Sequence, residues 1–367
     1  MKRLIALALA ATALPLSAQQ VLGDLTVMPP VASDYTPERT PWGDPDLRGG
    51  WPINDIAELP VQRPAQYGDR FWKTEEELAS EQGRVEALED AYDAEDEEGT
   101  IGLGHWIEYQ AGSRRTSMLV DPADGQLPGL TAEGIERASR MRSSWIPGQT
   151  YDWVDDFDSW DRCWTRGFPA SMLPFRYNNG IRIYQSPGYV VIALEMLGTR
   201  VIPVSDVPQW GTGLTGMFGQ SRGRWEGNSL VIETTNLQPG ASPLNLATRG
   251  VPFGNTLPMS EQATTVERLT PVGPDTLTYE LTYADPVVWE APFTLRVNWT
   301  RDDDYEFFEY ACHEGNVQVR NYITANRTAR AQEYERGRMV EPIDPDAPPP
   351  AAMDPASRGI GNNKDDD

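Results

Sequence analysis

Hydrophobic and polar residues alternate through much of the second half of the chain. In residues 276–283, Leu or Tyr stands at every odd position and Thr or Glu at every even one. Such alternation is typical of an antiparallel strand with one face buried and the other in solvent. Similar runs of β-branched and aromatic residues predict further strands at residues 181–185, 189–196, 200–204, 223–225, 229–236, 263–270, 293–300 and 305–312.

The order of these strands predicts the fold class. They follow one another at hairpin-like spacing, with Glu-Gly-Asn as the turn between 223–225 and 229–236, and no regular helix interrupts them. A parallel sheet with helical crossovers is therefore not expected. Consecutive antiparallel strands close most simply into an up-and-down barrel or pack as a sandwich. We expect a mainly β protein with a lipocalin-like barrel over residues 166–325, and a β-sandwich is the alternative.

Helical patterns lie before and after the strands. Residues 74–95 predict a helix that Thr74 caps, with Glu77 as its partner in a capping box. Residues 131–144 predict a second helix by the same reasoning, with Thr131 as its cap. Together with a short strand at 118–120 and a loop at 151–164, these helices form a region over 71–165 that we expect to pack on the barrel. A helical run begins at residue 320, and we place the C-terminal helix at 326–341.

The two ends of the chain have compositions that do not favour regular structure. Residues 19–70 are rich in Pro and Gly, which suits an extended arm over the surface of a domain, with Trp42 and Trp51 as its anchors. Residues 342–367 have the composition of a disordered acidic tail.

The first 18 residues have the pattern of a secretory signal peptide. Lys2 and Arg3 precede an apolar run from Leu4 to Leu14, and the small residue Ala18 marks the expected cleavage site. A membrane anchor is the alternative, but the run is short for a bilayer span, which needs about 20 residues. We therefore expect a periplasmic or secreted protein with no membrane span in the mature chain.

Charge excludes one class of partner. The formal net charge is −24, and removal of Lys2 and Arg3 with the signal peptide makes it −26. Such a surface repels phosphate backbones, so nucleic acid is not an expected partner. Twelve tryptophans, 14 tyrosines and nine phenylalanines allow a sizeable core or an aromatic-lined cavity instead.

The chain has two cysteines, Cys163 and Cys312. In an oxidising compartment they predict one disulfide, and two free buried thiols are the alternative. A metal site is not expected, because His105 and His313 lie far apart and show no metal-binding spacing. No phosphate-binding loop or dinucleotide-binding glycine pattern is present, so we expect no cofactor.

A set of motifs resembles a known family. In order, they are PWGDPDLRGGW, RTSMLVDPADGQLP, RC, MLPFRYNN, QSPGYVVIALEM, SRGRWEGNSLVIETTN and EYACHEGN. This order is similar to that of a large family of exported proteobacterial and acidobacterial proteins, over roughly residues 41 to 325. The resemblance implies a compartment and an architecture, and it implies no particular reaction.

Three residues are candidates for acid–base chemistry. His313 titrates near neutral pH and is the candidate general base, although a histidine bonded to a buried partner beside the disulfide is the alternative. Glu195 interrupts an apolar strand, where burial would raise its pKa, unless it pairs with the nearby Arg200. Glu267 lies on another predicted strand, and the same two alternatives apply to it: a carboxylate whose pKa is raised by burial, or a partner in an ion pair. We expect Glu195 or Glu267 to act as the acid or to orient the base.

Six further residues are candidates for substrate binding: Tyr177, Asn178, Asn179, Arg224, Trp225 and Asn236. The Asn pair precedes Gly180, so a turn with left-handed backbone geometry is the structural alternative. Core packing is the structural alternative for Trp225, and it is the preferred one. Asn236 follows the apolar face of its strand inward if that strand stays regular.

Two functions from different classes remain open. The first is a cofactor-independent lyase, isomerase or hydrolase that acts on a small, partly apolar molecule in a barrel cavity. The second is a non-catalytic binding or carrier protein for a hydrophobic small ligand, since small barrels often hold one. A protein that binds partners through its arm and its acidic surface is a third, weaker hypothesis.

Overall fold

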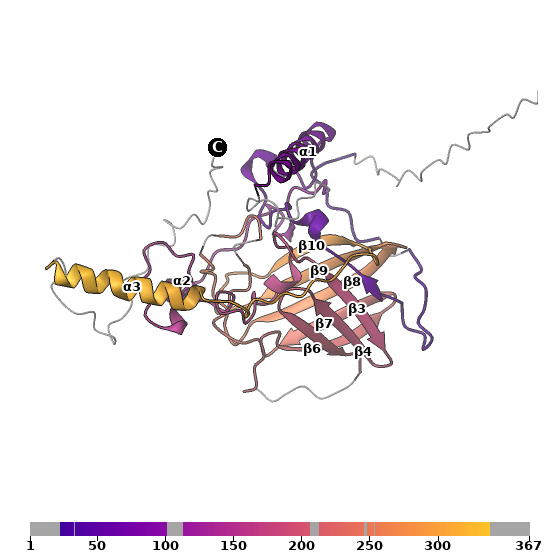
Figure 1. Cartoon of the computed structure of the whole chain (residues 1–367). Coiled ribbons are helices and arrows are strands. Elements are labelled where there is room, and N and C mark those ends of the chain that lie inside the picture. Colours follow the sequence, from indigo (N-terminus) through magenta and orange to yellow (C-terminus); the bar gives the residue numbers. More distant parts are fainter. Residues whose placement is uncertain are drawn as a thin grey trace, which may run out of the picture.

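The fold is seen in a computed structural model, which describes residues 23–32, 34–100, 113–205, 213–245, 248–252 and 254–337 (Figure 1). The expected signal peptide at 1–18 and the expected tail at 342–367 lie outside these residues, as does the end of the predicted helix at 326–341.

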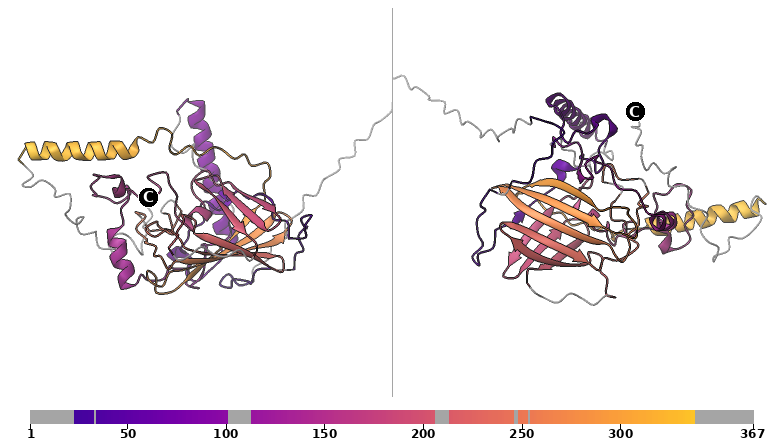
Figure 2. Two further views of the ribbon diagram at one scale, coloured as in Figure 1. Left: turned by 90° about the horizontal axis from the view of Figure 1, so that it is seen from below. Right: turned by 180° about the vertical axis from the view of Figure 1, so that it is seen from behind.

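Two antiparallel sheets form the centre of the molecule (Figures 1 and 2). The smaller sheet has the strand order β1-β3-β4-β5, with bounds Gly49–Gly50, Ile181–Ser186, Tyr189–Leu194 and Gly198–Pro203. The larger sheet has the order β2-β10-β9-β8-β7-β6, with bounds Leu119–Asp121, Phe293–Thr300, Thr276–Ala284, Thr264–Gly273, Ser229–Thr235 and Gln220–Glu226. The prediction of a mainly β, antiparallel protein is therefore confirmed.

The two sheets pack face to face around one apolar core. Ile183 and Ile192 of the smaller sheet and Leu269 and Trp299 of the larger one belong to the same buried cluster. Strand pairing within the described residues stays inside each sheet, and these residues form no closed barrel. The sandwich alternative fits this arrangement as well as the predicted barrel does.

One predicted strand is wrong. Residues 305–312 belong to no strand, and the segment 301–312, which we call the strap, runs extended across the smaller sheet. Its apolar and polar residues alternate as they do in a strand. Side chains, however, form hydrogen bonds to its backbone at Tyr305 and Phe308, where a strand would pair with the backbone of a neighbouring strand. Arg182 donates to the carbonyl oxygen of Tyr305 at 3.1 Å, and the Phe308 amide donates to Glu195 at 2.8 Å.

The N-terminal arm contributes more to the fold than a surface segment would. Gly49 and Gly50 pair with β3, and Leu47, Trp51 and Ile53 are buried in the core between the sheets. Trp51 is thus an anchor, as predicted.

Three α-helices lie in the described part of the chain: α1 (Glu75–Glu97), α2 (Ala132–Arg140) and α3 (Gln318–Glu335). Both predicted caps are confirmed. Thr74 and Glu77 exchange side chain-to-amide hydrogen bonds at 3.2 and 2.7 Å, and Thr131 accepts from the Gly134 amide at 2.9 Å. None of these helices is both long and apolar enough to cross a bilayer. Figure 1 shows α3 extending away from the sheets.

Candidate functional site

Glu195 holds the strap against the smaller sheet. This buried carboxylate lies just after β4 and accepts four hydrogen bonds. One oxygen accepts from Asn178 at 3.0 Å and from the Phe308 amide at 2.8 Å, and the other accepts from the Gly180 amide and the Tyr305 hydroxyl, both at 2.8 Å. The carboxylate is fully engaged in structural bonds, and its suggested pairing with Arg200 is wrong.

Gly180 is required at this place for a steric reason. A Cβ atom at residue 180 would come within 2.8 Å of Glu195, Tyr305 and Phe307. Only glycine therefore lets the strap approach β3 closely enough for its amide and hydroxyl donors to reach the carboxylate.

We expect Glu195→Gln to loosen the strap. The glutamine amide group would place an N–H₂ where an acceptor is needed, and two buried donors would lose their partner. The free energy of unfolding should fall by about 1–3 kcal/mol, the usual cost of unsatisfied buried donors. Urea denaturation measures this change, and Glu309→Gln, an exposed change on the same strap, is the control. Equal stability of the two variants would contradict this role of Glu195.

Glu267 lies in the core, in an ion pair with Arg200 that joins the two sheets. Arg200 of β5 donates to the two carboxylate oxygens of Glu267 on β8 at 2.8 and 2.5 Å. Both side chains are buried, with exposed fractions of 1% and 0%. The Arg200 guanidinium also lies 4.4 Å from the centre of the Phe168 ring, so its flat face packs on an aromatic surface.

Hydroxyl groups complete the surroundings of this ion pair. Tyr279 donates to Glu267 at 2.8 Å, and Arg200 donates to Ser221 at 3.1 Å. Burial raises the pKa of Tyr279 well above its ordinary value, and the adjacent Glu267 carboxylate raises it further. The phenol therefore stays protonated and remains a donor. With every carboxylate oxygen engaged, Glu267 is not positioned to reach a substrate.

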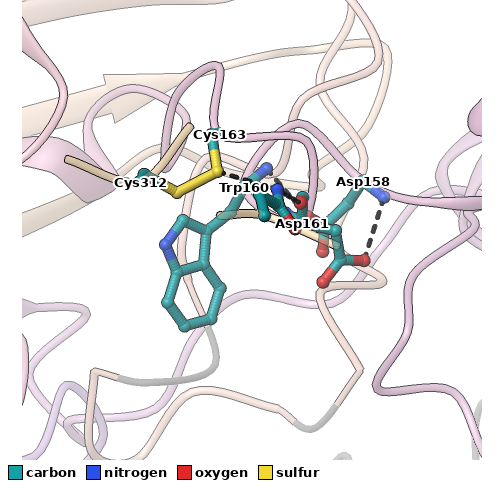
Figure 3. The surroundings of a disulfide bond; sticks show 6 residues. Asp158, Trp160, Asp161, Cys163 and Cys312 are labelled. Carbon is teal, nitrogen blue, oxygen red and sulfur yellow. Dashed lines mark hydrogen bonds between the residues drawn. A yellow bond between two sulfur atoms is a disulfide. The ribbon is translucent and has the colours of Figure 1, made fainter. Parts of the chain in front are cut away.

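His313 lies outside the core. It is exposed in the turn over residues 312–315, which follows the strap, so its expected place in a buried cavity is wrong. The adjacent disulfide between Cys163 and Cys312 is confirmed, with Cα atoms 5.5 Å apart. Figure 3 shows it beside Trp160, where the Asp158 carboxylate accepts from the amides of Trp160 and Asp161 at 2.8 Å.

The three candidates for acid–base chemistry are therefore not brought together. His313 is in solvent, whereas Glu195 and Glu267 are buried in two separate hydrogen-bond networks. No hydrogen bond or ion pair joins any two of these three described residues.

The residues Tyr177, Asn178 and Asn179 build the turn before β3. Asn178 has a φ of +54°, the left-handed geometry that the paired asparagines suggested. Asn179 closes the turn by bonding both backbone groups of Phe175, at 2.7 and 2.9 Å. Burial, and then the neighbouring Tyr310, raise the pKa of Tyr177 to about 12. The geometry favours the structural alternative for all three.

The other three binding candidates lie at the far edge of the larger sheet. Arg224 is exposed and pairs with Glu226 and Glu233 at 2.9 and 2.5 Å. Trp225 packs against the core. Asn236 has a φ of +55° just after β7, so it does not continue the inward-facing side of that strand. These residues do not converge on a common site.

A cavity that sequence reasoning missed lies between the N-terminal arm and the turn that joins β8 to β9. We call it the arm cavity, and its volume is about 610 Å³. Its walls come from three distant parts of the chain: Tyr35, Pro37, Glu38, Asp46, Arg48, Gly49 and Trp51; Pro271, Gly273, Pro274, Asp275 and Leu277; and Arg301.

The arm cavity combines an apolar base with charged groups. Trp51 and Leu277 are buried core residues that reach it from the two sides. Arg301 lies over the Trp51 ring, 5.9 Å from its centre, and pairs with Asp303 at 2.8 Å. Arg48 pairs with Asp46 at 2.5 Å and is half-exposed. The motif PWGDPDLRGGW supplies four of these wall residues, and it is the only sequence signal that pointed here.

Within the described part of the chain, no group of three or more His, Cys, Asp or Glu side chains is placed to hold a metal ion.

Comparisons with known proteins add no assignment. No protein-family model, curated protein or solved structure matches the chain. The resemblance to the exported family therefore stays a prediction that rests on the motifs alone.

Proposed function

We propose that the chain is a non-catalytic binding protein of the periplasm or the extracellular space, which holds a small, partly apolar ligand in the arm cavity. One observation carries this proposal. The arm cavity has a volume of about 610 Å³, and it is lined by the apolar side chains of Trp51 and Leu277 and by the cations Arg48 and Arg301. Binding sites for small molecules typically have volumes of about 300–1,000 Å³, an apolar lining and a few polar groups that orient the ligand.

The geometry favours binding over the enzymatic alternative. Acid–base catalysis needs its groups within hydrogen-bond reach of one substrate. The candidates His313, Glu195 and Glu267 lie apart, and none of them lines the arm cavity. The two carboxylates already hold the strap and the core ion pair in place.

The filled core also supports the proposal that the ligand binds at the end of the fold and not between the sheets. Large side chains such as Trp299, Tyr279 and Tyr283 are completely buried between the sheets. We therefore propose that the sheets act as a packed sandwich, with the ligand bound where the arm crosses its end. Export is supported by the disulfide, because such bonds persist in oxidising compartments.

Gly273→Phe should abolish ligand capture by filling the arm cavity. A Cβ atom at residue 273 would meet only Thr276 atoms, at 3.8 Å, so the backbone tolerates the change. The purified, oxidised protein would be incubated with extract from its source, and bound compounds would be identified by native mass spectrometry. We expect the wild type to retain a small molecule of unchanged mass and Gly273→Phe to lose it.

Gly213→Phe is the matched control, because a Cβ atom there meets no atom of the described residues within 4 Å and Gly213 does not line the arm cavity. It should bind as the wild type does. Retention of the same compound by Gly273→Phe would exclude the arm cavity as the site. If the wild type converts a compound, and if this conversion depends on His313, the result would instead support the enzymatic alternative.

A further inference from the structure

A second cavity lies beside residues 58–67 of the arm. We call it the arginine cavity, and its volume is about 440 Å³. It is bounded by residues 58–67 of the arm, by residues 249–252, and by Lys73 and Glu81 at the start of α1. Its apolar walls are Pro60, Pro64, Tyr67, Val251 and Pro252.

Arg63 lines this cavity as a buried cation without an ion-pair partner among the described residues. The residue is 3% exposed, and its guanidinium lies 4.4 Å from the centre of the Phe71 ring. One terminal nitrogen donates to the carbonyl oxygens of Gly68 and Asp124 at 3.4 and 3.3 Å. Its Nε and Nη2 have no hydrogen-bond partner within the described part of the chain. Burial of this kind is costly for a charge, and it lowers the pKa of Arg63.

The carboxylates of the cavity are already occupied. Glu81 pairs with Lys73, and Glu58 pairs with Arg249. Three cations (Arg63, Lys73 and Arg249) and two carboxylates (Glu58 and Glu81) therefore line the cavity, which leaves one net positive charge. In a chain of net charge −24, this is a local reversal of sign.

A second buried guanidinium adds to this positive region. Burial, and then repulsion by Arg296 and Arg63, lower the pKa of Arg115 to about 9. Arg115 bonds to the backbone oxygens of Ser117 and Arg296 at 2.9 and 3.3 Å. The carboxylates of Asp124 and Asp69 act on Arg63 in the opposite direction to burial and raise its pKa.

We propose that the arginine cavity binds a small organic monoanion, such as a carboxylate, whose apolar body packs against the prolines, Tyr67 and Val251. The anion would balance the net positive charge of the cavity lining and accept from guanidinium donors, which form strong, planar, two-point bonds with carboxylates. This site is separate from the arm cavity and does not depend on the function proposed for it.

The test uses 4-fluorobenzoate as the probe and follows its ¹⁹F NMR signal at low ionic strength. The wild type should bind it saturably, in the range of about 1 mM or tighter. The matched cation 4-fluorobenzamidine and the neutral 4-fluorobenzyl alcohol should bind at least about tenfold more weakly, because the cavity selects for charge.

Variants assign the binding to the arginine cavity. Arg63→Met should weaken 4-fluorobenzoate binding by about tenfold or more, since it removes a charged donor. Arg249→Gln should weaken it by a smaller factor, because the net charge of the lining falls to zero. Arg48→Gln and Gly273→Phe change the arm cavity and should leave the affinity unaltered.

Three results would overturn the proposal. These are no saturable binding by the wild type up to about 10 mM, equal binding of the benzoate and the benzamidine, and full affinity in both Arg63→Met and Arg249→Gln. If Arg63→Met does not fold, Arg249→Gln decides the matter, because Arg249 is half-exposed and lies outside the core. Loss of arm-cavity binding alone would contradict only the function proposed above.

Discussion

Glu267→Gln should lower the free energy of unfolding by about 3–5 kcal/mol, because it leaves the charge of Arg200 buried without its counterion. Arg200 has an exposed side-chain fraction of 1%, so water cannot replace the lost carboxylate. The amide would also place an N–H₂ group against a guanidinium that carries donors only. Chemical denaturation monitored by circular dichroism measures the change.

Glu233→Gln is the control for this prediction. Glu233 pairs with Arg224 on the exposed face of the same sheet, where a salt bridge contributes about 0–1 kcal/mol. The double variant Arg200→Met/Glu267→Leu should be more stable than Glu267→Gln, because it removes both charges together. A loss below about 1 kcal/mol in Glu267→Gln would show that the ion pair does not hold the sheets together.

Removal of the disulfide should have an effect of similar size. Cys163 and Cys312 are 149 residues apart in sequence, and a closed loop of that length restricts the unfolded chain strongly. The loop-entropy model gives about 5 kcal/mol for this loop, and measured losses in native proteins are about 2–5 kcal/mol. We expect Cys163→Ala/Cys312→Ala to unfold at a correspondingly lower temperature in a calorimetric scan.

The wild type treated with a reductant is the comparison for this variant. It should unfold at the same temperature as the double alanine variant in the same reductant, and the variant should not respond to the reductant. If oxidised wild type and variant unfold at the same temperature, the bond does not contribute to stability.

Local sequence patterns predicted the elements of this fold well. The alternation of Leu and Tyr with Thr and Glu in residues 276–283 placed β9 correctly, because one face of that strand is buried. Thr74 and Thr131 marked helix starts through short-range bonds that depend only on neighbouring residues. The two cysteines allowed a single pairing, which the structure contains.

Contacts between distant residues were not predictable in the same way. Arg200 is five residues from Glu195, yet its partner is Glu267, because β5 and β8 face each other from opposite sheets. The strap has the alternation of a strand but meets Glu195 and Arg182 side chains in place of a strand backbone. Periodicity reports which face is buried, and it does not report what covers that face.

The candidate sites were missed for the same reason. The arm cavity is assembled from residues 35–51, residues 271–277 and Arg301, which no sequence window contains together. The arginine cavity depends on the Nε and Nη2 of Arg63 having no hydrogen-bond partner among the described residues, a property of its three-dimensional surroundings. Sequence reasoning favoured the rare His313 instead, and rarity of a residue type says nothing about its exposure.

The fastening of the strap has a consequence for biosynthesis. Glu195 and Cys163 leave the ribosome 110 and 149 residues before their partners Tyr305 and Cys312. A product that stops after β10 would contain every strand that the structure describes, yet its Glu195 would lack the donors of Tyr305 and Phe308 and its Cys163 would lack a partner. Chains that terminate before the strap should therefore be open at this point and easily degraded, so that synthesis of the strap acts as a check on the assembled sheets.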